Sequence, residues 1–114
     1  MWFENRLVCS FDDLCLQFAT SNSCAFVYFV LNTDSNAIKI GKARDLDKRL
    51  KSLQTSSPAT LQLLKAIQVT GEKEAAEMES KLHRRFTHLR ITGEWFKAEK
   101  ELLDYLSNLP YEVH

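Results

Sequence analysis

The stretch Phe26-Val27-Tyr28 … Lys39-Ile40-Gly41 decides how the rest of the chain is interpreted. Residues 25–31 form an unbroken apolar run, rich in aromatic and β-branched residues, which predicts a buried strand. Residues 32–36 are all turn formers, and residues 37–41 then alternate between apolar and polar side chains. Two such strands joined by a short polar loop predict a β-hairpin.

The predicted hairpin carries two polar side chains in unexpected places. Tyr28 lies in the middle of the buried strand, and its hydroxyl needs a partner there. Lys39 lies in the middle of the second strand, where a half-buried ammonium needs a compensating interaction. The two residues are either an amphipathic core tyrosine and a lysine on a solvated face, or a functional pair on one face of the sheet.

Length, charge and cysteine content restrict the class of protein. A chain of 114 residues predicts one domain with a modest core. Fifteen basic and fifteen acidic residues give a net charge of zero, so any contacts with phosphates must be local. Three cysteines without C-x-x-C spacing argue against a disulfide framework or zinc site and fit a reducing compartment. The sequence contains neither an apolar run of ~18 residues nor a signal-peptide pattern, so we expect a cytoplasmic protein without a membrane partner.

The remaining periodicities predict an α/β (α+β) domain, with a small three-stranded, mainly antiparallel sheet flanked by helices. Residues 1–24 form a helical extension, opened by Ser10, whose apolar face packs on the domain or on another chain. Residues 25–114 form the domain. Within it we expect a helix from Asp45 to about Gln54, a third strand over 60–69 with a bulge at Leu64, and a helix opened by Thr70. A connector over 88–92 and a last helix ending at Pro110 complete the layout.

Two helical residues lie at the borders of apolar stripes. Arg49 borders the stripe formed by Leu46, Leu50 and Leu53, where an arginine is either a surface side chain or a functional cation. Glu79 falls just inside the apolar face of the later helix, where a carboxylate costs free energy unless it is paired. It either pairs with a cation such as Arg49 or Lys39, or binds a metal.

The most basic segment of the chain follows Gly41. It contains Lys42, Arg44, Lys48, Arg49 and Lys51 and predicts a local phosphate-binding surface. His83, on the same side of its helix as Glu79, either donates to a phosphate or packs in the core. Trp95 and Phe96 act as core anchors or, alternatively, as stacking platforms for bases.

The ordered set Tyr28, Lys39, Arg49, Glu79 and Gly93-Glu94-Trp95-Phe96 resembles the GIY-YIG nuclease superfamily, in its phage and microbial branch with a VYF…IKIG…GEWF pattern. The resemblance covers residues 26–96. It implies a GIY-YIG-like fold and hydrolysis of DNA phosphodiesters with one Mg²⁺ or Mn²⁺ ion. By position, Tyr28 would be the general base, Arg49 would stabilise charge on the phosphate, and Glu79 would hold the metal. Lys39 would supply positive charge beside Tyr28.

Three positions depart from the family pattern. Phe26 replaces the first glycine of the name-giving motif, Lys39 replaces its second tyrosine, and Leu53 replaces a histidine. A nucleic-acid- or partner-binding module of the same fold, with little or no catalysis, is therefore the alternative function. A purely structural protein is a third, which explains neither Tyr28 nor Glu79. We expect the isolated chain to bind DNA weakly, so that specificity requires a homodimer or a protein partner.

Overall fold

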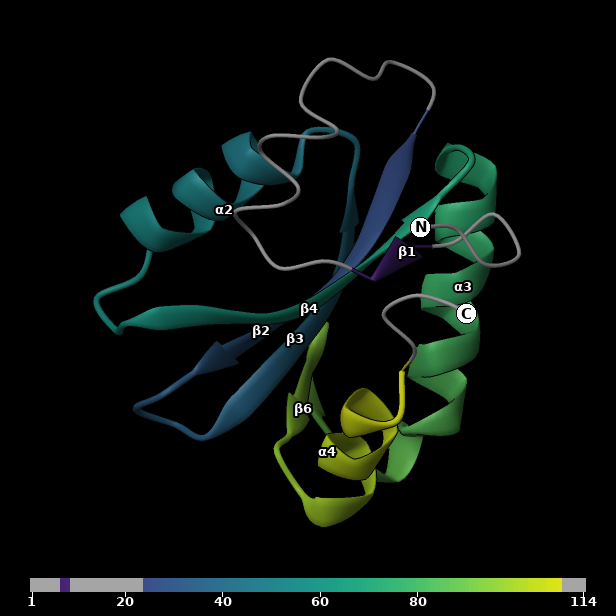
Figure 1. Cartoon of the computed structure of the whole chain (residues 1–114). Helices are drawn as coiled ribbons and strands as arrows, with labels where there is room; N and C mark the ends of the chain where they lie inside the picture. The colour runs from purple at the N-terminus through teal and green to yellow at the C-terminus, as the bar shows by residue number, and fades with distance from the viewer. Residues whose placement is uncertain (1–6, 9–23, 110–114) are drawn as a thin grey trace.

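The computed structural model describes residues 7–8 and 24–109 (Figure 1). The predicted helix opened by Ser10, and the question of what it packs against, lie outside these residues. The described elements follow in the order β1 (Leu7–Val8), β2 (Ala25–Asn32), β3 (Ala37–Ala43), α2 (Leu46–Thr55), β4 (Leu61–Val69), α3 (Glu72–Arg85), the 3₁₀ turn η1 (Thr87–Leu89), β5 (Arg90–Thr92), β6 (Trp95–Lys97) and α4 (Lys100–Ser107).

The sheet is larger than the sequence predicted. Six strands lie in the order β1-β4-β2-β3-β6-β5, and every neighbouring pair is antiparallel. The expectation of three strands is therefore wrong, although the α+β class holds. The connector expected over 88–92 instead contains part of η1 and the strand β5. All three residues of β5 are exposed, so the strand has no apolar alternation from which it could be recognised.

The hairpin that organises the fold is confirmed. Tyr28 lies opposite Gly41, and the pairing continues without a shift along β2 and β3. The loop closes with Asn36 in the left-handed region at φ 54°, a conformation that asparagine tolerates. On the other side of β2, the pairing with β4 shifts between Phe29 and Val30, which leaves Leu64 as the predicted bulge residue.

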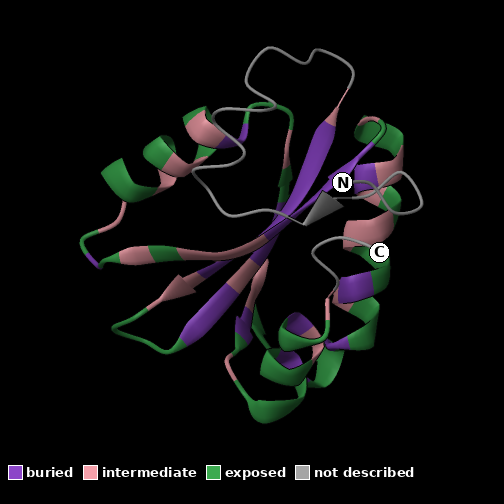
Figure 2. Cartoon of the chain, in the orientation of Figure 1, coloured by how far each residue is buried: buried purple, intermediate pink, exposed green. Residues whose placement is uncertain are grey.

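Helices cover both faces of the sheet (Figure 1). One face of β2 packs with α2 through a cluster that contains Phe26, Tyr28, Val30, Leu46 and Ala66. The other face packs with α3 and α4 through a larger cluster of buried side chains, among them Val27, Phe29, Ile38, Ile40, Leu82, Phe86 and Leu102. The central strands are buried along most of their length as a result (Figure 2).

Local capping fixes where the two helices next to the site begin. The Asp45 carboxylate accepts a hydrogen bond from the Lys48 amide at 3.0 Å, which confirms the predicted start of α2. Ahead of α3, the amide and the hydroxyl of Thr70 both donate to Glu74 Oε1, at 3.0 and 2.8 Å. That helix ends at Arg85, one turn earlier than its apolar stripe suggested, and η1 then carries Leu89 into the core.

Candidate functional site

Tyr28 lies in a slot made by two small neighbours. Its pairing partners are Gly41 on β3 and Ala66 on β4, and the tyrosine is only 1% exposed. A Cβ atom built on Gly41 would lie 2.5 Å from the Tyr28 hydroxyl oxygen and 2.6 Å from Cζ. The phenol ring therefore lies across the backbone of β3, in space that is free because residue 41 has no side chain.

Next to this tyrosine, one edge of β3 is paired with another strand over only part of its length. Strand β6 pairs with β3 only over Ala37–Lys39, and the Ile40 amide then donates to the Glu94 carbonyl at 3.0 Å. Beyond that bond, no described strand pairs with this side of β3. Helix α3 occupies the position instead: His83 Nε2 donates to the Ile40 carbonyl at 2.9 Å, and its ring packs on buried Phe96.

Lys39 lies on the same face of the sheet as Tyr28. Residues opposite each other in an antiparallel pair share a face, and Lys39 is two positions from Gly41, the partner of Tyr28. The ammonium of Lys39 lies 3.0 Å from Glu94 Oε1 and 5.7 Å from the centre of the Trp95 ring. Glu94 is therefore the partner that this half-buried lysine required.

The tyrosine hydroxyl is held in its protonated form. Burial raises the pKa of Tyr28 to about 12; the positive charge of Arg49 opposes this shift, and the negative charges of Glu94 and Glu79 add to it. If Lys39 activated Tyr28 directly, the pKa would be lowered. The shift has the opposite direction because desolvation by burial is its largest cause. The Lys39 ammonium pairs with Glu94 instead.

Glu79 reaches the same place from α3. Burial raises the pKa of its carboxyl, the neighbouring charge of Glu94 adds to the shift, and His83 and Lys42 oppose it. A hydrogen bond to Glu94 also favours the protonated form. The oxygen Oε2 of Glu79 is buried, and no hydrogen-bond donor among the described residues reaches it. Within that part of the chain, Glu79 forms no ion pair with Arg49 or Lys39, which were its predicted partners.

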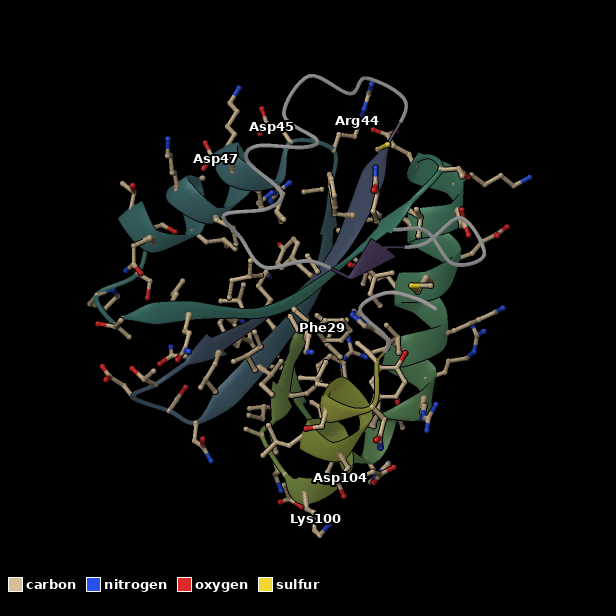
Figure 3. The ribbon with its side chains drawn as sticks, in the orientation of Figure 1. Phe29, Arg44, Asp45, Asp47, Lys100 and Asp104 are labelled. Atoms are coloured by element: carbon tan, nitrogen blue, oxygen red, sulfur yellow. The ribbon has the colours of Figure 1, made fainter. Side chains whose placement is uncertain are left out.

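A basic groove leads to these residues. This cavity of about 480 Å³ lies between the end of β3, α2 and the first turns of α3, and it is lined by Ala25, Lys42, Ala43, Arg44, Arg49, Glu72, Lys73, Ala75 and Ala76. Its four cations face one carboxylate, Glu72, which pairs with Arg44 at 3.4 Å. Figure 3 shows Arg44 at the end of the molecule where α2 begins, far from Lys100.

The groove lies next to the helical turn that carries Glu79. Ala75 lines the groove one helical turn before Glu79, and the charge of Lys42 acts on the Glu79 carboxyl. Arg49 likewise lines the groove and acts on Tyr28. The site thus brings together Tyr28, Arg49 and Glu79 from three different elements.

Other predicted phosphate contacts lie elsewhere. Lys48 is exposed on α2 but does not line the groove, and Lys51 pairs with Asp47 at 3.1 Å. His83 lies beside Glu79, with its ring nitrogen bonded to a backbone carbonyl. Lys73 is a site residue that the sequence did not indicate, and Glu94 was indicated only as part of the Gly93-Glu94-Trp95-Phe96 motif, without a role. Both come from segments distant from the hairpin in sequence, and only the fold brings them to it.

The donor set suits a divalent cation with few protein ligands. No group of three or more His, Cys, Asp or Glu side chains gathers in the described residues. The buried Oε2 of Glu79 nevertheless lacks a donor, as expected of a carboxylate that binds a cation. Magnesium is commonly held by one or two carboxylates, with waters and substrate phosphates completing the shell. The residues present therefore fit such an ion.

Comparison with known families places the chain among nuclease-like proteins. A family model of the T5orf172 domain, a phage-associated nuclease-like domain, matches residues 25–109. The chain belongs to this family. The match corrects the expectation from the sequence, because the family model that matches is not a GIY-YIG model. No curated protein and no solved structure gives a significant match. In the described ranges, no helix has both the length and the apolar character to cross a bilayer.

Proposed function

We propose that this domain is a metal-dependent endonuclease that hydrolyses phosphodiesters of DNA. The observation that supports it most is that Tyr28, Arg49 and Glu79 come within range of one another's charges beside a groove lined by four cations. Membership of a nuclease-like family agrees with this chemistry. A structural protein would have no use for a buried carboxylate oxygen without a donor beside a buried phenol.

The basic groove would bind the sugar–phosphate backbone. Lys42 of β3 and Lys73 of α3 both line it, and so does Arg49, whose charge acts on Tyr28. Arginine presents several N–H donors in a planar fork that suits phosphate oxygens. In the proposed reaction Arg49 stabilises the negative charge that develops on the phosphate.

Glu79 would hold the divalent cation, Mg²⁺ or Mn²⁺. When bound, such an ion stabilises charge on the leaving oxygen and polarises bound water. The Glu79 carboxylate supplies a ligand from the rigid helix α3, and His83 fixes this helix to the edge of β3 through the Ile40 carbonyl. His83 would thus act as a positioning residue.

Tyr28 would orient the attacking water and accept its proton. A phenol with a pKa of about 12 carries almost no charge near neutral pH, so the protein without a cation is a poor base. The negative charges of Glu94 and Glu79 contribute to the raised pKa, and positive charge bound beside them would oppose that contribution. Activity should therefore depend strictly on the cation.

The same raised pKa favours one alternative, a nucleic-acid-binding module that does not cleave. In that case the groove binds phosphates and Tyr28 serves only as a buried anchor. The two functions share the groove and differ in whether a bond is broken.

The test is cleavage of supercoiled plasmid in the presence of Mg²⁺ or Mn²⁺. We expect nicked and linear products from the wild type and none from Glu79→Gln, which keeps the size of the side chain and removes its charge. Glu77→Gln is the matched control, since Glu77 is exposed on the same helix, and it should cut like the wild type. DNA binding by an inert wild-type protein, over a range of metals and substrates, would establish the binding module instead.

A further inference from the structure

Trp95 lies on the same face of the sheet as Tyr28. It pairs with Lys39 across β3 and β6, and Lys39 shares its face with Gly41, the partner of Tyr28. The next residue, Phe96, points to the opposite face, where it is completely buried in the larger cluster. The two neighbouring aromatic residues of β6 therefore have different surroundings.

Trp95 is not part of the core. It is only partly buried, and among the described residues it belongs to neither of the two apolar clusters. The helix on its face of the sheet, α2, packs on β2 through Leu46, and Figure 1 shows this helix well away from β6. A large, partly exposed aromatic ring that does not fill the core is available to a partner.

Two neighbours hold the indole ring of Trp95 in place. The Lys39 ammonium lies 5.7 Å from the centre of the ring, within the range of a cation–π contact. The same ammonium lies 3.0 Å from Glu94 Oε1, and the Glu94 carbonyl accepts a hydrogen bond from the Ile40 amide at 3.0 Å. Because the ring is held against β3, a planar ligand would bind to it with little loss of side-chain freedom.

The basic groove, the tyrosine and the tryptophan follow one another along β3. On the face that carries Trp95, this strand presents Lys39, Gly41 and Ala43 in that order, because every second residue shares a face. Tyr28 lies across Gly41, and Ala43 lines the groove. Trp95, opposite Lys39, is therefore on the side of Tyr28 that is away from the groove.

We propose that Trp95 is a stacking platform for one unpaired base of the DNA, next to the phosphate that is cut. The inference rests on the proposed function and names its substrate class, which is DNA with an unpaired nucleotide beside the cleaved bond. A strand that is bound in the groove by its phosphates and passes over Tyr28 brings its next nucleotide to Trp95. An indole ring stacks on the face of a base, which is accessible only when the base has left the duplex stack.

The test compares binding to two DNA duplexes that differ by one unpaired adenine. Fluorescence anisotropy is measured in EDTA, so that no strand is cut. We expect the wild type to prefer the bulged duplex, and Trp95→Leu to lose roughly 5- to 150-fold of its affinity for it, the range given by stacking of one base. The affinity of Trp95→Leu for the perfect duplex should be unchanged. Trp95→Phe keeps an aromatic ring and should keep part of the preference.

Tyr105→Leu is the matched control for Trp95→Leu. Tyr105 is also a partly buried aromatic residue, but it lies on α4, with its ring centre 5.5 Å from that of Phe86. This variant should bind both duplexes like the wild type. Equal losses for both duplexes in Trp95→Leu, or an unchanged preference, overturn the proposal and leave Trp95 as a structural residue of the β3–β6 pairing.

Tryptophan fluorescence gives a second measurement, which does not depend on how Trp95→Leu folds. The chain has two tryptophans, so in Trp2→Phe the emission comes from Trp95 alone. Stacking should quench this emission when the bulged duplex binds, and more strongly than when the perfect duplex binds. Binding of the bulged duplex without quenching overturns the proposal.

Plasmid cleavage by the same wild-type preparation separates failure of this inference from failure of the proposed function. A wild type that cuts plasmid with Mn²⁺ but does not prefer the bulged duplex refutes the stacking platform alone. A wild type that prefers the bulged duplex through Trp95 but never cuts supports the platform and refutes cleavage. Binding to neither duplex refutes both.

Discussion

Substitution of Gly41 by alanine is the most direct test of how the tyrosine is positioned. The added methyl group would lie 2.5 Å from the Tyr28 hydroxyl oxygen, 2.6 Å from Cζ and 3.1 Å from Cε1. Ordinary carbon contacts lie at roughly 3.5–4.0 Å, so the ring must move by about 1 Å. The ring cannot move without disturbing the cluster that contains Leu46 and Ala66.

The expected cost of Gly41→Ala follows from this overlap. Overpacking of a buried site typically costs about 1–3 kcal/mol of unfolding free energy. For a domain of this size each kcal/mol lowers the Tm by roughly 4–8 °C. The backbone conformation adds no cost to Gly41→Ala, because among the described glycines Gly93 alone has a positive φ. We also expect a loss of cleavage larger than the loss of stability explains, since the hydroxyl is displaced from the site.

The assay is urea denaturation of four proteins: the wild type, Gly41→Ala, Tyr28→Phe and the double variant. Phenylalanine lacks the hydroxyl oxygen at 2.5 Å but keeps the Cζ atom at 2.6 Å from the added methyl group. Gly41→Ala should therefore remain costly in the Tyr28→Phe background. A cost below about 0.5 kcal/mol in the wild-type background, with cleavage intact, would refute the position assigned to the ring.

Three further outcomes are expected. Burial raises the pKa of Tyr28 from 10.0 to about 12, so the unfolded chain loses the phenol proton before the folded chain does as the pH rises. Roughly 2–3 kcal/mol of stability should therefore be lost between pH 10 and 12. Tyr28→Phe should not show this loss of stability at alkaline pH. Because burial raises the pKa of Glu79, stability falls as the pH rises above about 4.5. Glu79→Gln should therefore melt at a higher temperature than the wild type at neutral pH, and an unchanged Tm would contradict the cost assigned to this carboxylate. Lys73→Gln should reduce the slope of log DNA affinity against log salt concentration by about one, and Lys100→Gln should leave it unchanged. Fluorescence anisotropy titrations measure the slopes. Equal slopes for the wild type and Lys73→Gln would exclude the groove as the DNA contact.

The parts of the fold that could be predicted are those with a strong local signal. The hairpin, the cap at Asp45 and the bulge at Leu64 all follow from the pattern of apolar residues and turn formers within a few positions. Strands β5 and β6 have three residues each, and β5 is exposed throughout, so neither shows a period that distinguishes it from a loop. This is why the sheet was predicted with too few strands.

The candidate site was predictable as a set of residues but not as a network. Tyr28 and Glu79 were indicated because each places a polar group where the local pattern calls for an apolar side chain. The partners of these groups are set by the fold. Glu94 meets Lys39 only because β6 pairs with β3, and this strand could not be recognised. The sequence placed the charge of Lys39 beside Tyr28, whereas in the fold its ammonium pairs with Glu94.

The short pairing between β6 and β3 has a consequence for how the molecule loses its site on heating. Tyr28 lies in a strand paired along its length on both sides, whereas the segment that carries Glu94 is held to the β2–β3 hairpin by three residue pairs and two further backbone bonds. Segments with few such bonds open in local fluctuations well before the whole chain unfolds. Amide protons of the β5–β6 hairpin should therefore exchange with solvent faster than those of β2.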